Sequence, residues 1–215
     1  MRLLRAATII AALSLTAADL SAQVRGNFEN SWFWGAKAGI NTLRANSSGT
    51  SSVPTWGLDW LITRKQGGLY VSADQSFFNS TVVETDANSP SGTRQVKINN
   101  LRRVDFAGVV FPRTFGPVRP YAGVGAAIAL LASAVAQPDS LGGAPSQSFD
   151  NSIDKLRSRA SLLVMAGAQV QRNRTAFFVQ ETVLPSGGDF LIKSALSFFE
   201  IGVRYNFGSS IEGSR

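Results

Sequence analysis

The serine residues of this chain lack the partner that would make them catalytic. The 215-residue sequence contains no His and no Cys. A Ser hydroxyl is a weak nucleophile unless a neighbouring base activates it, and His is the most common base. Lys37 and Lys193 could replace that base, but no motif supports either of them. The sequence therefore predicts a protein that is not an enzyme.

Residues for cofactors and metals are equally sparse. Without Cys there is no disulfide and no thiolate metal site. Gly123 and Gly125 are not followed by a helix, so they do not form a phosphate-binding turn. The net charge is +7, but no basic stretch with interleaved aromatics is present. We expect no cofactor, no metal and no nucleic acid, and we expect the phosphates of lipid or lipopolysaccharide to be the anionic partners.

The charged residues that stand out alternate with apolar residues, so they share one face of predicted strands. The cations are Lys37, Arg103, Arg159 and Arg204, and the anions are Asp59, Asp74, Asp105, Glu181 and Glu200. Because the two signs nearly balance, we expect them to pair inside a barrel, with Lys37 contacting both Asp59 and Glu200. The alternative, a narrow pore that these charges line, remains open.

Eight segments with a hydrophobic period of two would carry these charges. They cover residues 34–41, 56–62, 69–77, 103–110, 119–131, 159–171, 176–184 and 199–207. The seventh is the least regular, because Phe177 and Phe178 are adjacent and Gln180 and Glu181 lie on opposite faces. The uncharged stretch 121–136 is shorter than a membrane-spanning helix, so a strand running into a loop is favoured there.

The predicted connections alternate between short and long. Short turns fall at residues 64–68, 112–118 and 172–175. Polar connections fall at residues 44–54, 79–94 and 133–155, with a shorter one at residues 185–189. This alternation is typical of an all-β, up-and-down antiparallel transmembrane β-barrel, here of about eight strands, with short turns and both termini in the periplasm.

A period of two does not say which face is inside, and a soluble lipocalin-like barrel would have its apolar face inward. Three features favour the apolar face outside. One is that each predicted short turn carries two basic residues, which would face anionic lipid headgroups. Gly35, Gly57 and Gly202 lie on the polar face, where a narrow lumen needs small residues. Trp34 and Tyr205 lie toward strand ends, where aromatic girdles meet lipid headgroups.

The N-terminus indicates export. Arg2 and Arg5 precede a short apolar run, and small residues around Ala22 follow it, which predicts a cleaved signal peptide over residues 1–22. The barrel would occupy residues 23–207, and residues 208–215 would form a short tail. Charged residues make up 16% of the chain, which suits a protein that meets lipid through alternating apolar residues. We expect a monomer in the bacterial outer membrane.

Two short motifs resemble the outer-membrane β-barrel superfamily that includes the transmembrane domain of OmpA. They are Arg-Pro-Tyr-Ala-Gly-Val-Gly at residues 119–125 and Gly-Val-Arg-Tyr-Asn-Phe at residues 202–207. The resemblance implies that Tyr205 and Phe207 belong to the signal read by the barrel-assembly machinery. In that superfamily the pattern usually ends at the aromatic, whereas this chain continues to Arg215. No peptidoglycan-binding domain follows, so the resemblance implies no cell-wall anchor.

These features predict a non-enzymatic outer-membrane barrel. It would contribute to envelope integrity and offer surface loops for adhesion or ligand contact. A narrow ion or small-solute channel is the alternative. A lipid-modifying enzyme is disfavoured, because small barrels with that activity rely on a His.

Overall fold

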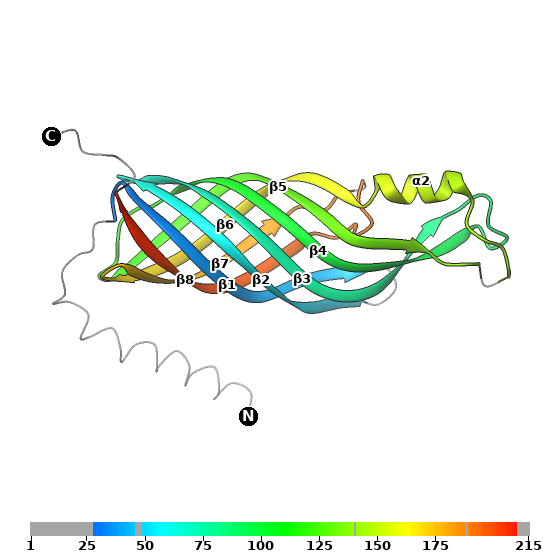
Figure 1. Ribbon diagram of the computed structural model, residues 1–215, viewed down its shortest axis with the longest axis horizontal. Coiled ribbons are helices and arrows are strands. Elements are labelled where there is room, and N and C mark those ends of the chain that lie inside the picture. The colour runs from blue at the N-terminus through cyan, green and yellow to red at the C-terminus, as the bar shows by residue number, and fades with distance from the viewer. Residues whose placement is uncertain (1–27, 46–48, 140, 188, 210–215) are drawn as a thin grey trace, which may run out of the picture.

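The structure is a computed structural model that describes residues 28–45, 49–139, 141–187 and 189–209. Within these ranges the chain forms eight strands and one helix. The strands are β1 (Ser31–Ala45), β2 (Gly49–Arg64), β3 (Gly67–Thr85), β4 (Thr93–Val110), β5 (Val118–Ala136), β6 (Ser158–Arg172), β7 (Thr175–Leu184) and β8 (Leu196–Ser209), and the helix is α2 (Gln147–Lys155). Figure 1 shows the strands wound around one long axis, with α2 at one end.

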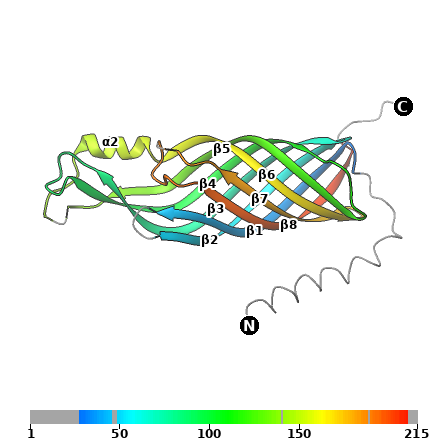
Figure 2. The same cartoon turned by 180° about the vertical axis from the view of Figure 1, so that it is seen from behind.

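The strands form one closed barrel in the order β1 to β8, with antiparallel neighbours throughout. β1 pairs with both β2 and β8, so Lys37 lies opposite Gly57 on one side and Gly202 on the other. Figures 1 and 2 show this continuous wall from opposite sides. The predicted all-β, up-and-down antiparallel fold is therefore confirmed.

Most of the large hydrophobic side chains that are exposed lie on the outward face of the strands. On β8, Ile201 and Phe207 expose 60% and 65% of their surface, whereas Glu200 and Arg204 expose 0% and 1%. A soluble barrel would show the reverse pattern, because its only apolar environment is the interior. The prediction of an apolar outer face is confirmed, and the lipocalin-like alternative is wrong.

Three short connections lie at one end of the barrel, here called the turn end. They comprise residues 65–66, 111–117 and 173–174, which agrees with the predicted short turns. Asn173 adopts the left-handed backbone conformation, with φ 55°, that a tight hairpin requires. Ser31 pairs with Ser209, so β1 begins and β8 ends at this same end.

The opposite end, here called the loop end, differs from the prediction. Most of residues 44–54 and 79–94 are strand, because β2 begins at Gly49, β3 continues to Thr85 and β4 begins at Thr93. These extensions are rich in Ser, Thr and Asn, so the hydrophobic alternation disappears while the backbone hydrogen-bond ladder continues. The last connection is longer than predicted, since it runs over residues 185–195.

The region 133–155 also contains structure that the sequence pattern did not predict. β5 is a strand along its whole apolar length, as favoured above, and it ends only at Ala136. The helix α2 follows, and the Ser146 hydroxyl caps it by accepting a hydrogen bond from the Phe149 backbone N–H at 3.3 Å. Phe149 and Ile153 form its buried face. No helix among the described residues is both long and apolar enough to cross a membrane.

The predicted chain boundaries stay predictions. The signal peptide, residues 1–22, lies outside the described residues, and so does the end of the predicted tail, residues 210–215. β8 continues past Phe207, because Gly208 and Ser209 pair with Trp32 and Ser31 of β1.

Candidate functional site

A cluster of buried ionisable residues occupies the interior of the barrel. It consists of Lys37, Asp59, Asp74, Arg103, Asp105, Glu200 and Arg204, here called the charged layer, and each of these residues exposes at most 6% of its surface. All seven were predicted to face the lumen. They come from β1, β2, β3, β4 and β8, so barrel closure is what brings them together.

Lys37 forms ion pairs with Asp74 and Glu200. Its Nζ lies 2.9 Å from a carboxylate oxygen of Asp74 and 3.0 Å from one of Glu200. It also donates to the Tyr70 hydroxyl at 3.0 Å. Gly57, which lies between Lys37 and Asp74 in the strand register, carries no side chain. A Cβ there would overlap Asp74 Oδ1, so glycine lets Lys37 reach across β2 to β3.

Arg204 pairs with Asp59 by the same arrangement one strand earlier. Gly35 lies opposite both residues, and a Cβ at Gly35 would overlap Asp59 Oδ1 and Arg204 Cγ. The guanidinium of Arg204 therefore crosses β1 and forms an ion pair with Asp59. The predicted contact between Lys37 and Asp59 is wrong, whereas the predicted contact between Lys37 and Glu200 is present.

Arg103 lies close to three carboxylates, two of which also pair with Lys37. Its guanidinium lies 2.8 Å from Asp74, 3.1 Å from Asp105 and 3.6 Å from Glu200. The same group lies 3.5 Å from the centre of the Phe198 ring. Three cations thus share four carboxylates in the charged layer. Removing one partner from such a layer leaves an uncompensated buried charge, which costs about 3 to 5 kcal/mol in a dry site.

Two predicted members lie elsewhere. Glu181 is exposed on the outer face, where it accepts a hydrogen bond from Ser197 at 3.0 Å. Its assignment to the lumen is wrong, because on β7 the outward positions are those of Phe177, Val179 and Val183. Arg159 is buried but lies at the loop end, where it donates to the backbone oxygen of Pro185.

Uncharged polar residues complete the layer, and the sequence analysis did not assign them to it. Gln180 Nε2 donates to the Tyr70 hydroxyl at 3.0 Å and to Glu200 at 3.1 Å. Its Oε1 accepts from the Tyr121 hydroxyl at 3.0 Å and from Arg204 at 3.2 Å. Even-numbered residues of β7 point inward, so the alternation along this strand is the sequence signal that places Gln180 in the lumen.

The connection between β7 and β8 closes the loop end from inside, and residues 185–195 are here called the plug loop. Phe190, Leu191 and Ile192 are fully buried. The Leu191 backbone N–H donates to the Leu156 oxygen at 3.1 Å. Lys193 forms an ion pair with Glu84 of β3 at 2.9 Å, so the loop spans from β8 to β3.

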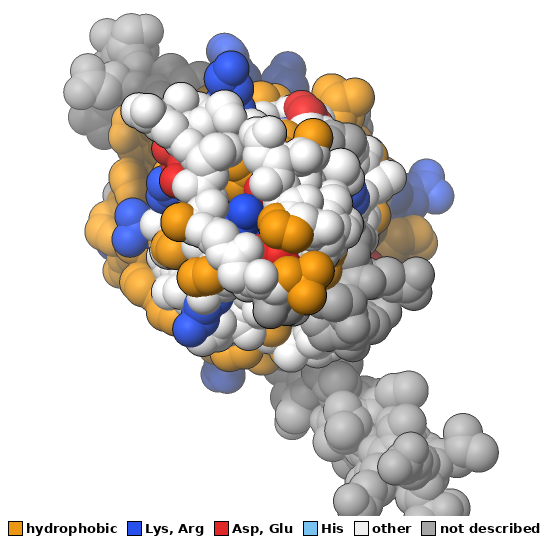
Figure 3. All heavy atoms as spheres, turned by 90° about the vertical axis from the view of Figure 1, so that its right-hand side faces the viewer, with side chains coloured by type: hydrophobic (Ala, Val, Ile, Leu, Met, Phe, Trp, Pro, Cys, Tyr) orange, Lys and Arg blue, Asp and Glu red, His pale blue; other side chains and the backbone are white. Residues whose placement is uncertain are grey.

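The β3–β4 and β5–α2 connections form an ordered knob at the loop end, here defined as residues 86–92 together with residues 137–139 and 141–146. Arg94 holds the two parts together, because its guanidinium binds Asp86 at 2.7 Å and the backbone oxygens of Gln137 and Gly143 at 3.0 and 3.1 Å. These contacts give a defined conformation to a region that the sequence pattern predicted only as polar connections. Figure 3 shows this end of the molecule as mostly uncharged polar side chains and backbone.

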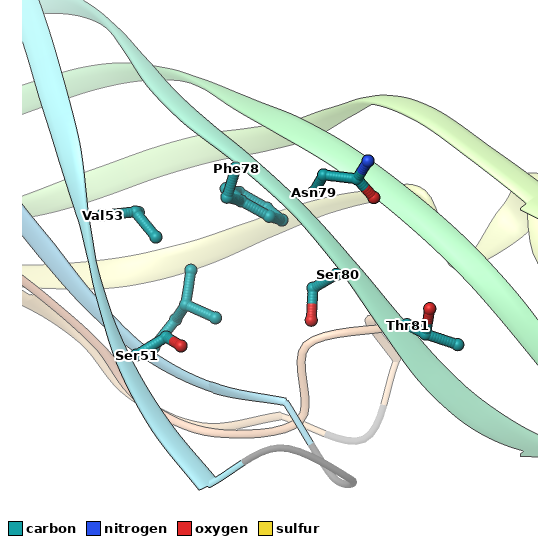
Figure 4. Close-up of a pocket in the computed structure, with 7 residues that line it drawn as sticks. Ser51, Val53, Phe78, Asn79, Ser80 and Thr81 are labelled. Atoms are coloured by element: carbon teal, nitrogen blue, oxygen red, sulfur yellow. The ribbon is translucent and has the colours of Figure 1, made fainter.

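β2 and β3 separate toward the loop end. Their pairing stops at Thr55 and Ser76, beyond which β2 pairs only with β1 and β3 only with β4. A pocket of about 350 Å³ lies in this gap, as Figure 4 shows. Leu43, Ser51, Val53, Phe78, Asn79, Ser80 and Thr81 line it. None of these lining residues belongs to the charged layer.

Aromatic residues gather on the outer face near the turn end. The ring of Trp60 lies 5.4 Å from that of Trp32 and 5.6 Å from that of Trp34. Tyr205 and Phe207, the residues of the implied assembly signal, are exposed and contact each other at 5.1 Å between ring centres. The described residues contain no cluster of acidic side chains suited to a metal ion.

No protein-family model matches the chain, and no curated protein matches it in sequence. Its fold is similar to that of Neisserial surface protein A, with 13% identity over 82% of this chain and 97% of that one and a TM-score of 0.54. It is also similar to Ail, the attachment invasion locus protein of Yersinia pestis, with 12% identity over 84% and 100% of the chains and a TM-score of 0.51. A structure of Ail with the heparin analogue sucrose octasulfate gives 15% identity, the same coverage and a TM-score of 0.52.

These likenesses define the class of fold. The chain has the architecture of a small eight-stranded outer-membrane β-barrel, as the resemblance to the OmpA superfamily implied. At these identities the likeness extends to the fold alone.

Proposed function

We propose that the protein is a non-enzymatic outer-membrane β-barrel that contributes to envelope integrity and offers its loop end for adhesion or ligand contact. The filled interior carries this proposal. The charged layer occupies the lumen, and Phe190, Leu191 and Ile192 of the plug loop close its loop end. An eight-stranded barrel whose interior is filled by side chains has no open passage through its centre, so its function would depend on the surface at its end.

The outward hydrophobic surface supports the membrane location. Large apolar side chains such as Val124 and Leu162 expose 62% and 69% of their surface on the barrel wall, which only a lipid environment would cover. The similar proteins are outer-membrane proteins of bacteria. In this proposal the turn end faces the periplasm, the barrel-assembly machinery inserts the chain, and lipopolysaccharide surrounds the monomer.

The ordered knob supports the contact role. A surface held by Arg94 and α2 has lost its loop entropy before any partner binds, which favours association. Ail, to which the fold is similar, is described as an attachment invasion locus protein and has been seen with a heparin analogue. The knob is therefore the part of this chain that we propose for external contact.

Cell fractionation and gel migration test the membrane proposal. The mature protein should fractionate with outer membranes and migrate differently on a detergent gel before and after boiling, because a closed barrel resists cold detergent. A protein recovered in the soluble periplasm would contradict the proposal.

A narrow channel is the second candidate, and one observation favours it. Several buried polar atoms of the charged layer lack a hydrogen-bond partner within the described protein, among them Asp59 Oδ1, Asp105 Oδ1 and Glu200 Oε1. Such atoms bind water, so the layer can be hydrated. Single-channel recording of refolded protein separates the candidates, because a plugged barrel gives no unitary conductance and a channel gives discrete steps.

A lipid-modifying activity is tested directly. Lipid A and phospholipids incubated with the refolded protein should stay chemically unchanged, because no His is available as a base. Release of fatty acid or transfer of an acyl chain would overturn the non-enzymatic part of the proposal.

A further inference from the structure

Each short turn at the turn end carries two basic residues. They are Arg64 and Lys65 in the first turn, Arg113 and Arg119 at the second, and Arg172 and Arg174 at the third, here called the turn cations. The three turns join β2 to β3, β4 to β5 and β6 to β7, so they recur at every second strand of the closed barrel. The positive charge is therefore distributed around the circumference of this end.

Four turn cations are exposed and have no counter-ion among the residues that the structure describes. Arg64, Lys65, Arg113 and Arg174 are exposed, and none of them forms an ion pair within the part of the chain that the structure describes. Arg119 is half-buried and lies 3.6 Å from the centre of the Phe28 ring. Charges left unpaired on every turn are available to an external anion.

At the loop end, three cations form ion pairs. There Arg94 pairs with Asp86 at 2.7 Å, Arg157 with Asp154 at 3.2 Å, and Lys193 with Glu84 at 2.9 Å. Those three pairs neutralise positive charge in place. Two other loop-end cations, Lys97 and Lys155, are exposed and form no ion pair within the described residues, so the loop end supplies the control for the turn cations.

The turn cations also lie next to the lipid-facing aromatic residues. Arg64 follows Trp60 by four residues on β2, and Trp60 contacts Trp32 and Trp34. Tyr205 lies opposite Thr175, the first residue after the third turn. Aromatic girdles mark the level where hydrocarbon gives way to headgroups, so the turns lie at headgroup depth.

We propose that the turn cations bind the phosphates of anionic phospholipid headgroups in the leaflet at the turn end. This inference rests on the proposed membrane location. A ring of cations at headgroup depth fits a lipid layer, which contacts the whole circumference, better than a protein, which would contact one side. Such cations attract anionic headgroups within about 10 Å, and salt screens the attraction.

Quenching of intrinsic tryptophan fluorescence tests the proposal. Three of the four tryptophans form the cluster beside the first turn, so they report the lipid found there. The full mature chain is placed in nanodiscs of phosphatidylcholine and phosphatidylglycerol, with bromine on the acyl chains of one lipid at a time. Quenching by the two brominated lipids gives the local occupancy of each lipid beside the tryptophans. The occupancy of phosphatidylglycerol should be about twofold that of phosphatidylcholine. One complete cation–headgroup contact would give a roughly fivefold preference.

Matched variants locate the effect. Arg64→Gln, Arg113→Gln and Arg174→Gln together remove three of the six turn cations and should weaken the preference for phosphatidylglycerol, whereas about 1 M salt should abolish it. Lys97→Gln, Lys155→Gln and Lys193→Gln remove the same amount of charge at the loop end and should leave the preference unchanged. Inorganic phosphate at matched ionic strength should also leave it unchanged, and displacement by phosphate would assign the turns to a free anion instead.

Two failures can be told apart. If neither brominated lipid quenches, the chain is not in the bilayer and the proposed function fails. If both lipids quench equally in the unaltered protein, the membrane location stands and the headgroup inference is overturned. The comparison of the two lipids uses only the unaltered protein, so its result does not depend on whether the variants fold.

Discussion

Lys37 on β1 and Asp74 on β3 form an ion pair across a strand that lies between them. The contact, 2.9 Å from Nζ to Oδ1, passes over Gly57 of β2. Arg204 and Asp59 repeat the arrangement over Gly35 of β1. In both cases the glycine supplies the space that a long basic side chain needs to reach the second strand along.

The first prediction follows from this arrangement. Gly57→Val should destabilise the barrel by about 3 kcal/mol or more, because its side chain would occupy the path of Lys37 and separate buried charges. Gly108 is also within a strand but has open space where a Cβ would lie, so Gly108→Val is the control and should cost far less. The measurement is urea unfolding in detergent, and equal costs would contradict the space-filling argument.

Double-mutant cycles on unfolding should reveal which carboxylates Lys37 uses. Lys37→Met combined with Asp74→Leu or with Glu200→Leu should show a coupling energy between about 0.5 and 3 kcal/mol. Lys37→Met combined with Asp59→Leu should show a smaller coupling, because Asp59 binds Arg204. A coupling to Asp59 as large as that to Glu200 would refute the observed pairing.

Lipid exposure of the wall predicts a strong position dependence for an added charge. Val124 and Val135 both lie on β5 and expose 62% and 53% of their surface. Val124→Arg should impair assembly, since an arginine facing hydrocarbon costs about 2 to 4 kcal/mol near the midplane. Val135→Arg lies in the extension at the loop end and should be tolerated. The readout is the heat-modifiable fraction on a detergent gel, and similar fractions for both variants would argue against the membrane depth assigned here.

The plug loop should contribute stability through its apolar residues. Leu191→Ala should lower the free energy of unfolding by about 2 to 5 kcal/mol, because Leu191 is fully buried. Lys193→Ala in the same loop should cost no more than about 1 kcal/mol, because its ion pair with Glu84 is partly exposed. Thermal unfolding in detergent checks both, and a neutral Leu191→Ala would mean that the loop does not pack inside the barrel.

Arg94 should control the order of the knob without controlling the barrel. Arg94→Ala removes the contacts to Asp86, Gln137 and Gly143, so residues 137–139 and 141–146 should become open to protease while the unfolding midpoint of the barrel changes little. Arg157→Ala, which removes a half-exposed pair with Asp154, is the control and should leave protection intact. Unchanged protection in Arg94→Ala would show that the knob is ordered by other contacts.

The sequence predicts the wall of the barrel well, because lipid on one side and a narrow lumen on the other impose a strict period of two. Ile201, Val203 and Glu200 show that alternation directly. It fails on β7, where Phe177 and Phe178 are adjacent and the inward phenylalanine looks apolar enough to face lipid. The Phe178 ring centre instead lies 3.7 Å from the guanidinium of Arg204, so this phenylalanine packs inside against a buried cation.

The partners of the charged layer could be predicted only in part. Hairpin depth places Lys37 and Asp59 near the same level, but it does not say which side chain crosses which strand. That choice depends on the exact register, which sets Gly57 opposite Lys37 and Gly35 opposite Asp59. The extensions at the loop end were missed for a different reason, since their polar residues carry no hydrophobic signal.

Lys37 and Glu200 are separated by 163 positions along the chain, so their ion pair can form only after the last strand has been synthesised. Synthesis from the N-terminus produces Lys37, Asp59, Asp74 and Arg103 long before Glu200 and Arg204. A product truncated before β8 would leave Asp59 without its arginine and two open strand edges, which expose it to aggregation and proteolysis. An incomplete chain would therefore lack both the closed barrel and the ion pairs that β8 supplies.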